Sequence, residues 1–304
     1  MYDIVIVGAG PAGLTAAIYA RRAGKSVLLL DKGAFGGQIT FSPKVENYPG
    51  FESVSGSELA DHFVEQALYQ GADVEVEKVT EVKDLGDKKE VYTEDGNVYE
   101  CRAVILALGA RHRHLGLPGE EKFIGEGISF CAVCDGAFYQ NKPVALIGGG
   151  NSALVEAILL AETSEKVYVV QNLDFLTGEK KLEDTLRSRG NVEIICGAVV
   201  TKIREGETFS GITIQKTATG EERELDVAGM FVAIGLVPEN VDFASLADLN
   251  EQGYFDTDEN CLTRTPGVFV AGDCRRKGVR QVATATADGA VAAVAACRYI
   301  DSMN

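Results

Sequence analysis

Two cysteines three positions apart, Cys131 and Cys134, are the residues of this sequence best suited to redox chemistry. The spacing lets the two sulfurs form a small-ring disulfide, and a disulfide over so short a loop adds little stability through chain entropy. In a chain otherwise organised for nucleotide binding, a CxxC pair is therefore more typical of a redox-active site than of a structural one. The alternatives are half of a zinc site or two unpaired core cysteines.

The remaining cysteines argue against a metal site. Structural zinc takes four ligands, usually from a second CxxC or a His pair. The other cysteines stand singly, with no His at ligand spacing: Cys101, Cys196, Cys261, Cys274 and Cys297. We predict no metal site.

Composition excludes several classes of protein. The 304 residues suffice for two domains, and a net charge of −16 argues against a nucleic-acid partner. No targeting segment begins the sequence, and no apolar run reaches the ~18 residues of a membrane span. The irregularly spaced cysteines suit a reducing compartment. We expect a cytoplasmic protein that binds neither nucleic acid nor membranes.

The first 31 residues have the order of a dinucleotide-binding unit. A β-branched run over residues 3–7 predicts a buried strand, and a helix over 14–22 and a strand over 26–30 follow the glycine-rich turn between them. In this turn, Gly8 permits a tight bend, Gly10 lets the backbone approach a pyrophosphate, and Gly13 lets the helix pack close to the sheet. Asp31 then stands where a ribose hydroxyl is bound.

The same order recurs in the second half of the chain. A strand over 143–147 leads into Gly148-Gly-Gly150, a helix and a strand over 166–170. We therefore predict an α/β fold with two Rossmann-like, three-layer nucleotide-binding domains, the second inserted into the first. The expected limits are 1–112 with 243–304 for the first nucleotide-binding domain, and 113–242 for the second, which carries the CxxC. Expected helices also include 57–70, capped by Ser57, and 282–300.

Seven short motifs together resemble the low-molecular-weight thioredoxin reductase family of flavoproteins over essentially the whole chain. They are GAGPAG, GGQ, ENYPG, CAVCDG, GGGNSA, FVAIG and the GDC…RQVATA tail. The resemblance implies a homodimer in which FAD, bound in the first domain, reduces the Cys131–Cys134 disulfide. The dithiol then reduces thioredoxin or a similar small protein. By similarity, Asp135 is the proton donor and acceptor, Cys134 lies next to the flavin, and Cys131 attacks the partner.

The same resemblance assigns an FAD site. Gly8, Gly10 and Gly13 take the pyrophosphate, and Asp31 takes the ribose. The other residues implied are Gln38 and Asn47 at the flavin, and Asp273, Gln281 and Val282 near the ribityl chain and pyrimidine edge.

The electron donor is where the sequence departs from the family. Members that use NADPH carry three arginines that hold the 2′-phosphate, and here those positions are Asn172, Leu173 and Thr177. Losing three charged hydrogen bonds of ~1.5–3 kcal/mol each weakens NADPH binding by roughly a thousandfold or more. An NADH enzyme wants an acid at the strand end, where Gln171 stands.

Ferredoxin is the donor that this sequence favours, with NADPH, NADH and a reduced deazaflavin as alternatives. Four cations lie within six residues, and an acidic ferredoxin would dock on such a patch. They are Arg275, Arg276, Lys277 and Arg280. A different class, an electron-transfer flavoprotein like the ferredoxin–NADP reductases, lacks the CxxC and is disfavoured by Cys131 and Cys134.

Overall fold

The computed structural model describes residues 1–33, 35–42, 45–204, 206 and 208–303, and the chain forms two compact units. The first comprises Met1–Arg111 with Val237–Asn304, and the second comprises His112–Leu236. Residues 237–242, which the sequence analysis assigned to the inserted domain, therefore pack with the first unit. Two three-residue strands at the unit boundaries, β7 (Ala110–His112) and β16 (Leu236–Pro238), pair with each other.

The first unit is built on a seven-stranded sheet in the order β3-β2-β1-β6-β5-β4, with β17 paired to β6. Its strands β1, β2, β3, β6 and β17 pair in parallel, and β4, β5 and β6 form an antiparallel meander. The strands are β1 (Tyr2–Val7), β2 (Val27–Asp31), β3 (Asp73–Val76), β4 (Val79–Asp84), β5 (Lys89–Thr93), β6 (Val98–Leu106) and β17 (Val268–Val270). Strand β6 joins the two parts of the sheet, because it pairs antiparallel with β5 and in parallel with β1 and β17.

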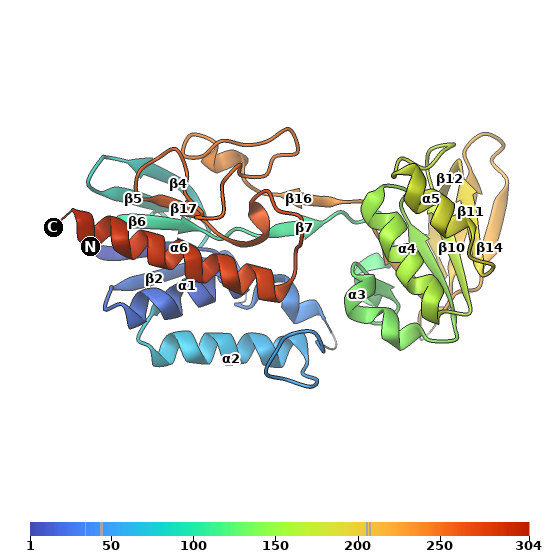
Figure 1. Ribbon diagram of the computed structural model, residues 1–304, viewed down its shortest axis with the longest axis horizontal. Coiled ribbons are helices and arrows are strands. Elements are labelled where there is room, and N and C mark those ends of the chain that lie inside the picture. The colour runs from blue at the N-terminus through green and yellow to red at the C-terminus, as the bar shows by residue number, and fades with distance from the viewer. Residues whose placement is uncertain (34, 43–44, 205, 207, 304) are drawn as a thin grey trace. The chain divides into compact units, whose positions relative to one another are not determined.

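Residues alternate between the two faces of this sheet, as a strand buried on both sides requires. Ile4 and Ile6 belong to a core beneath the helices, whereas Val5 and Val7 belong to a core on the opposite face. The helices are α1 (Pro11–Arg22), α2 (Gly56–Tyr69) and α6 (Val282–Ser302), with the short helices η1 (Gly37–Phe41), η4 (Val241–Phe243) and η5 (Gly272–Cys274). Figure 1 shows α1 and α6 side by side, so the tail of the chain completes the unit that its first residues begin.

The N-cap residue of helix α2 lies two residues before the expected one. Ser55, not Ser57, is the N-cap residue, and its hydroxyl accepts a hydrogen bond of 3.1 Å from the Glu58 amide. A Ser at N-cap satisfies one of the amides that a helix start leaves free. Which of the two serines caps the helix depends on the local backbone conformation, and the spacing of residues in the sequence does not reveal that conformation.

The second unit repeats the parallel sheet and adds a small antiparallel one. Its main sheet has the order β11-β10-β9-β15-β8, and β12, β13 and β14 form the other. The strands are β8 (Ile128–Ser129), β9 (Pro143–Ile147), β10 (Lys166–Gln171), β11 (Val192–Cys196), β12 (Ala198–Ile203), β13 (Ile212–Lys216), β14 (Glu222–Leu225) and β15 (Gly229–Val232). The helices are α3 (Ala132–Asp135), α4 (Asn151–Thr163) and α5 (Lys180–Arg187), with η2 (Glu120–Phe123) and η3 (Gly136–Tyr139). Val144 and Leu146 face the core under the helices, and Ala145 and Ile147 face the core under the small sheet.

Both units therefore have three layers around a parallel sheet, and the α/β fold with two nucleotide-binding domains is confirmed. Among the described residues, no helix is both long enough and apolar enough to cross a membrane. The described residues also contain no group of three or more His, Cys, Asp or Glu side chains arranged to hold a metal ion.

Candidate active site

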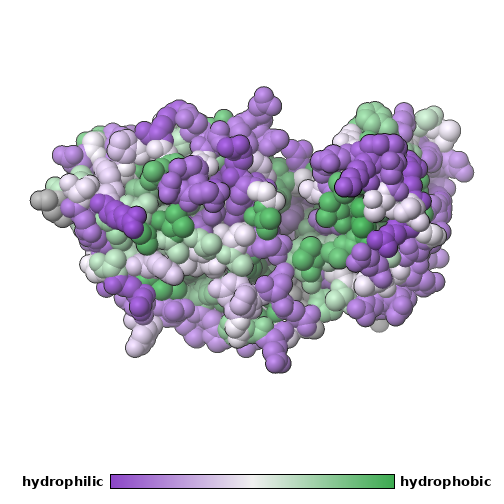
Figure 2. Space-filling view, viewed as in Figure 1, coloured by the Kyte–Doolittle hydropathy of each residue, from purple (hydrophilic) through white to green (hydrophobic). Residues whose placement is uncertain are grey.

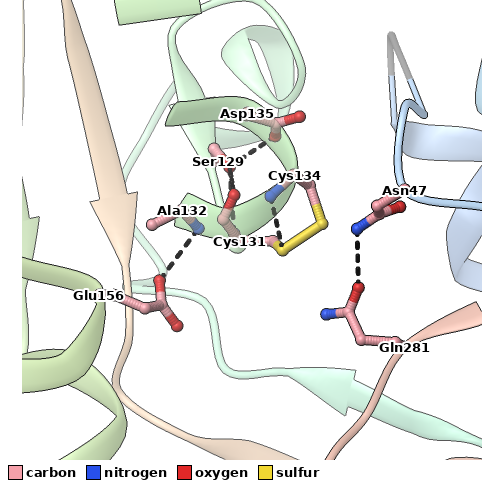
Figure 3. The surroundings of a disulfide bond; sticks show 8 residues. All are labelled: Asn47, Ser129, Cys131, Ala132, Cys134, Asp135, Glu156 and Gln281. Carbon is pink, nitrogen blue, oxygen red and sulfur yellow. Dashed lines mark hydrogen bonds between the residues drawn. A yellow bond between two sulfur atoms is a disulfide. The ribbon is translucent and has the colours of Figure 1, made fainter. Parts of the chain in front are cut away.

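Cys131 and Cys134 form a disulfide in the second unit, at the start of α3 (Figure 3). Cys131 is the N-cap residue of this short helix, and its sulfur accepts a hydrogen bond of 3.2 Å from the Cys134 amide. The Cys134 and Asp135 amides also donate to the Cys131 carbonyl. These bonds fix the backbone around the two sulfurs, so that the S–S bond can open without rearrangement of the helix.

Asp135 is buried beside the disulfide but does not bond to it. Its Oδ2 accepts a 2.6 Å hydrogen bond from the Ser129 hydroxyl, while its Oδ1 is buried without a hydrogen-bond partner in the part of the chain that the structure describes. The Ser129 oxygen accepts a bond of 3.1 Å from the Cys131 amide, which links the carboxyl to the cysteine segment. Burial raises the pKa of Asp135, and the Ser129 bond opposes that rise. A carboxyl with a raised pKa is able to exchange a proton nearer to neutral pH.

A second carboxyl, which the sequence analysis missed, belongs to the same site. Glu156 on α4 accepts a hydrogen bond of 3.1 Å from the Ala132 amide, between the two cysteines (Figure 3). Burial raises the pKa of Glu156 to about 7. A signal was present in the sequence: Glu156 has helical spacing to the apolar residues Ala153 and Leu160, which places an acid on the buried side of a helix. Ser129 carried no such signal, because its partner is six residues away.

The surface around the disulfide is apolar. Hydrophobic residues gather over α3 and α4 in the view of Figure 2. Val133, between the cysteines, and Val155 on α4 are 58 % and 51 % exposed, and Phe138 and Leu159 are 37 % exposed. Exposed apolar side chains next to a reactive group suit contact with another protein surface.

The predicted FAD residues lie in the first unit, where β1, β2 and β17 end. The three strands share one parallel sheet, so their carboxyl ends meet at the edge where such sheets bind ligands. Gly8 has φ +107°, and a Cβ there would be 2.3 Å from the Ala107 carbonyl oxygen. A Cβ on Gly13 would lie 1.8 Å from the Gly8 oxygen, whereas a Cβ on Gly10 would meet nothing within 4 Å. The turn is tight on its inner side and open at Gly10, as approach of a pyrophosphate requires.

Other predicted residues come together from distant parts of the chain. Asp31 accepts hydrogen bonds from the Ala9 amide at 2.6 Å and the Gly33 amide at 3.0 Å. The Asn47 amide donates to the Gln281 side chain at 3.0 Å, although 234 residues separate them. Val282 begins α6, and Gln38 is exposed in η1.

Asp273 follows β17 at the same edge of the sheet. Its Oδ1 is buried without a hydrogen bond in the described part of the chain, although Lys277 Nζ forms an ion pair with it at 3.1 Å. The Lys277 ammonium is close enough to attract this oxygen but is not aligned to donate a hydrogen bond to it. A buried carboxylate oxygen without a bonded donor fits a site that receives a hydroxyl or amide of a ligand.

The prediction that the four cations between Arg275 and Arg280 form an exposed docking patch is wrong. The side chain of Arg275 is 5 % exposed and holds Asp288 through bonds of 2.8 and 2.9 Å, and Lys277, 8 % exposed, contacts the same carboxylate at 3.1 Å. Arg280 lies 4.1 Å from the centre of the Tyr254 ring. Only Arg276 is well exposed, and it pairs with Asp256 at 2.7 Å. Arg275 and Lys277 thus tie this segment to α6, and the four cations together do not offer a free basic surface to an acidic protein.

The second glycine-rich turn keeps its shape for reasons of packing. A Cβ on Gly148 would lie 2.4 Å from the Ala233 oxygen, and one on Gly149 would lie 2.6 Å from Gln171 Cδ. The Gly149 carbonyl accepts bonds of 2.8 and 2.9 Å from the Thr177 and Gly178 amides. The turn is thus held without any nucleotide. The expected phosphate-clamp positions Asn172, Leu173 and Thr177 are exposed and uncharged.

Comparison with known proteins agrees with this architecture. Residues 2–289 match the family "Pyridine nucleotide-disulphide oxidoreductase". The chain is 40 % identical over 304 residues to thioredoxin reductase of Bacillus subtilis strain 168, covering 100 % of this chain and 96 % of that one. It is 42 % identical over 299 residues to a 34.2 kDa protein in the rubredoxin operon of Clostridium pasteurianum, covering 98 % and 97 % of the two chains.

A solved structure is similar along its whole length. Thioredoxin reductase from Streptococcus pyogenes MGAS5005 has a TM-score of 0.93 and 39 % sequence identity, with 99 % of each chain covered. The fold of this chain is therefore that of a solved thioredoxin reductase. The chain therefore belongs to the low-molecular-weight thioredoxin reductase family, within the pyridine nucleotide-disulphide oxidoreductases.

Proposed function

We propose that this protein is a flavin-dependent thioredoxin reductase, and the buried Asp135 beside the Cys131–Cys134 disulfide is the observation that carries this proposal. Reduction of that disulfide takes two electrons and two protons, breaks the S–S bond and leaves two thiols. The dithiol then passes both electrons and protons to the disulfide of thioredoxin, and its own S–S bond forms again. The exposed apolar residues around the disulfide suit a protein substrate better than a small molecule.

FAD fits the first unit. The open space at Gly10, the buried Asp273 oxygen and the Asn47–Gln281 pair all lie at or near the ligand edge of one sheet. When bound there, FAD supplies the two electrons that the disulfide requires. We assign Gly8, Gly10 and Gly13 to its pyrophosphate and Asp31 to its ribose. We further propose a cytoplasmic homodimer, as the family resemblance implies, and light scattering of the purified protein would measure its mass.

The cysteine assignment is tested by Cys134→Ser, which should abolish thioredoxin reduction and leave the ratio of FAD to protein unchanged. Cys196→Ser is the matched control, because Cys196 is a partly exposed free thiol of the same unit. Full turnover in the Cys134 variant would refute the role of the disulfide. Equal losses in both variants would show a general effect of removing a thiol.

The family relationship favours a pyridine nucleotide as electron donor over ferredoxin, which the sequence analysis put first. Because Arg275, Arg276, Lys277 and Arg280 do not form a free basic surface, the structure does not support docking of ferredoxin there. The neutral positions Asn172, Leu173 and Thr177 oppose NADPH in particular, because they leave the 2′-phosphate without a cation. NADH has no 2′-phosphate and is affected less by these three changes.

Loss of flavin absorbance without oxygen, measured in parallel with NADPH, NADH and reduced ferredoxin, decides between the donors. Rapid bleaching by micromolar NADH or NADPH would identify a pyridine nucleotide and exclude ferredoxin as a necessary donor. Bleaching by ferredoxin alone would restore the first interpretation. As a further test, Asn172→Arg with Leu173→Arg and Thr177→Arg should lower the KM for NADPH more than the KM for NADH.

A further inference from the structure

Glu156 contacts the cysteine segment from another element. It belongs to α4, 24 residues further along the chain, and its Oε2 accepts the 3.1 Å hydrogen bond of the Ala132 amide. Ala132 directly follows Cys131, whose sulfur accepts the Cys134 amide. The backbone that connects the two cysteines is therefore held by a carboxyl group that is not part of the CxxC motif. Figure 3 shows this carboxyl beside Ala132 and the Asp135 carboxyl beside Ser129.

The surroundings of Glu156 are those of a carboxyl that has no cation to balance it. In the described part of the chain Glu156 forms no ion pair, and its side chain is partly buried on the face of α4 that also carries the buried Ala153 and Leu160. Acids in such surroundings are normally paired, because a bare charge is poorly solvated there. A glutamine would make the same hydrogen bond at no electrostatic cost. The choice of an acid at this position points to a use of its charge.

We propose that Glu156 is a positioning residue for the thiol chemistry: it holds the Ala132 amide, and its charge governs how readily the reduced Cys131 thiol ionises. The reason is electrostatic. A negative carboxylate close to a thiolate in a poorly solvated place disfavours the thiolate, and a neutral carboxyl does not. The inference rests on the proposed function only in taking Cys131 as a redox-active thiol.

The titration range of Glu156 supports this role. Since burial raises its pKa to about 7, the carboxyl changes charge at the pH at which a cytoplasmic enzyme works. When Glu156 loses its proton, the thiol becomes harder to ionise and the nucleophile weakens. When Glu156 gains a proton, the thiolate is favoured. The two groups therefore titrate as a coupled pair, not independently.

Other ionisable groups lie on the elements that pack against α4, namely α3, η3, α5, β9 and β10. Asp135 on α3 is bonded to Ser129, and burial raises the pKa of Tyr139 on η3. On α5, Lys180, Glu183, Asp184 and Arg187 pair with one another, and Lys181 is exposed. Strand β9 has no ionisable side chain, and on β10 Lys166 pairs with Glu193 and lies over the Tyr168 ring. None of these groups contributes to the shift at Glu156.

The test measures thiol reactivity and does not need turnover. In a Cys134→Ser background, the rate at which iodoacetamide modifies Cys131 is followed from about pH 5 to pH 9 by mass spectrometry of the Cys131 peptide. Adding Glu156→Gln, which keeps the acceptor oxygen and removes the charge, should lower the pH midpoint. Between about pH 7 and pH 8, where the parental carboxylate is charged and most of the thiol is still protonated, Cys131 should then react about three- to tenfold faster. Glu162→Gln, a change of an exposed acid on the same helix, is the control and should leave the profile unchanged.

Each outcome has one meaning. An alkylation profile of the Glu156→Gln variant that matches the background would overturn the inference and leave only a structural tie to Ala132. A midpoint that rises would overturn it as well. If the profile shifts as expected but the unsubstituted enzyme fails to reduce thioredoxin with any donor, the proposed function is wrong and the inference stands. Glu156→Asp, which keeps the charge, should retain the parental midpoint if the variant keeps the unfolding temperature of its parent.

Discussion

Asp135 has an oxygen that is buried without a hydrogen-bond partner among the described residues, and the proton exchange that we propose for Asp135 depends on this buried carboxyl. The buried carboxyl binds its proton more tightly than an ordinary aspartate, so its pKa is raised. Its acid form consequently persists to higher pH and is available to protonate a departing thiolate. As the pH rises through that pKa, the donor is lost, and disulfide reduction should slow.

Asp135→Asn should therefore lower the rate of thioredoxin reduction by about 10²-fold or more, the usual effect of losing an acid–base group. The alkaline fall that the parent shows should also disappear. Steady-state rates over a range of pH, with flavin reduction by the donor measured separately, provide the comparison. Asp174→Asn, at an exposed acid of the same unit, is the control. A variant that keeps both the parental rate and its pH dependence would assign Asp135 a structural role alone.

At the scale of elements, the first glycine-rich turn separates folding from cofactor binding. Gly13→Ala should destabilise the protein, because the new Cβ would lie 1.8 Å from the Gly8 oxygen. Gly10→Ala adds a methyl group where nothing lies within 4 Å, at a φ of −78° that alanine tolerates. It should leave the unfolding temperature unchanged while FAD affinity falls about tenfold or more, because the methyl group blocks approach of the pyrophosphate.

These two variants are distinguished by the unfolding temperature of the apoprotein and by FAD titration. Normal FAD affinity in the Gly10 variant would place the pyrophosphate elsewhere. Unchanged stability in the Gly13 variant would mean that α1 can move away from the sheet.

The start of α2 offers a second test between neighbouring positions. Removing the N-cap hydroxyl by Ser55→Ala should lower the free energy of unfolding by about 1 kcal/mol, because the Glu58 amide loses its acceptor. Ser57→Ala, within the helix and exposed, should change it by much less. Urea unfolding of both variants gives the comparison. A larger loss of unfolding free energy in the Ser57→Ala variant would show that Ser57 is the N-cap residue, as the sequence predicted.

The elements that the sequence predicted are those whose signal is local. The strand, turn and helix around Gly8, Gly10 and Gly13 lie within one short segment, and so do Cys131, Cys134 and Asp135. What it missed depends on distant partners. Arg275 is buried because Asp288 on α6 receives it, and Glu156 belongs to the site because α4 packs beside Ala132. A run of cations or a helix pattern does not contain those contacts, since they arise only when elements pack.

At the scale of the molecule, the second unit has the properties of an independent domain. His112–Leu236 has its own cores on both faces of its sheet, and its two ends are joined by a 3.0 Å hydrogen bond from the Arg113 amide to the Gly235 carbonyl. The isolated fragment 112–236 should therefore unfold in one cooperative urea transition and retain its Cys131–Cys134 disulfide.

We expect fragment 1–111 to behave differently from fragment 112–236. Fragment 1–111 lacks β17 and α6, which pair with β6 and pack against α1, so it should remain unfolded or aggregate. Circular dichroism and urea titration of the two fragments test this difference. A folded fragment 1–111 would mean that the tail of the chain is dispensable for the first unit.

The place of α6 in the chain also bears on how the protein is made at the ribosome. Two residues that we assign to the flavin site are far apart in the sequence, because Asn47 emerges well before its hydrogen-bond partner Gln281. The cysteine-bearing unit is complete when residue 236 has left the exit tunnel, whereas the first unit must wait, with its sheet lacking β17, until residues 268–270 have emerged as well. The nascent chain thus completes the unit that holds the cysteine pair before it completes the unit to which we assign the cofactor.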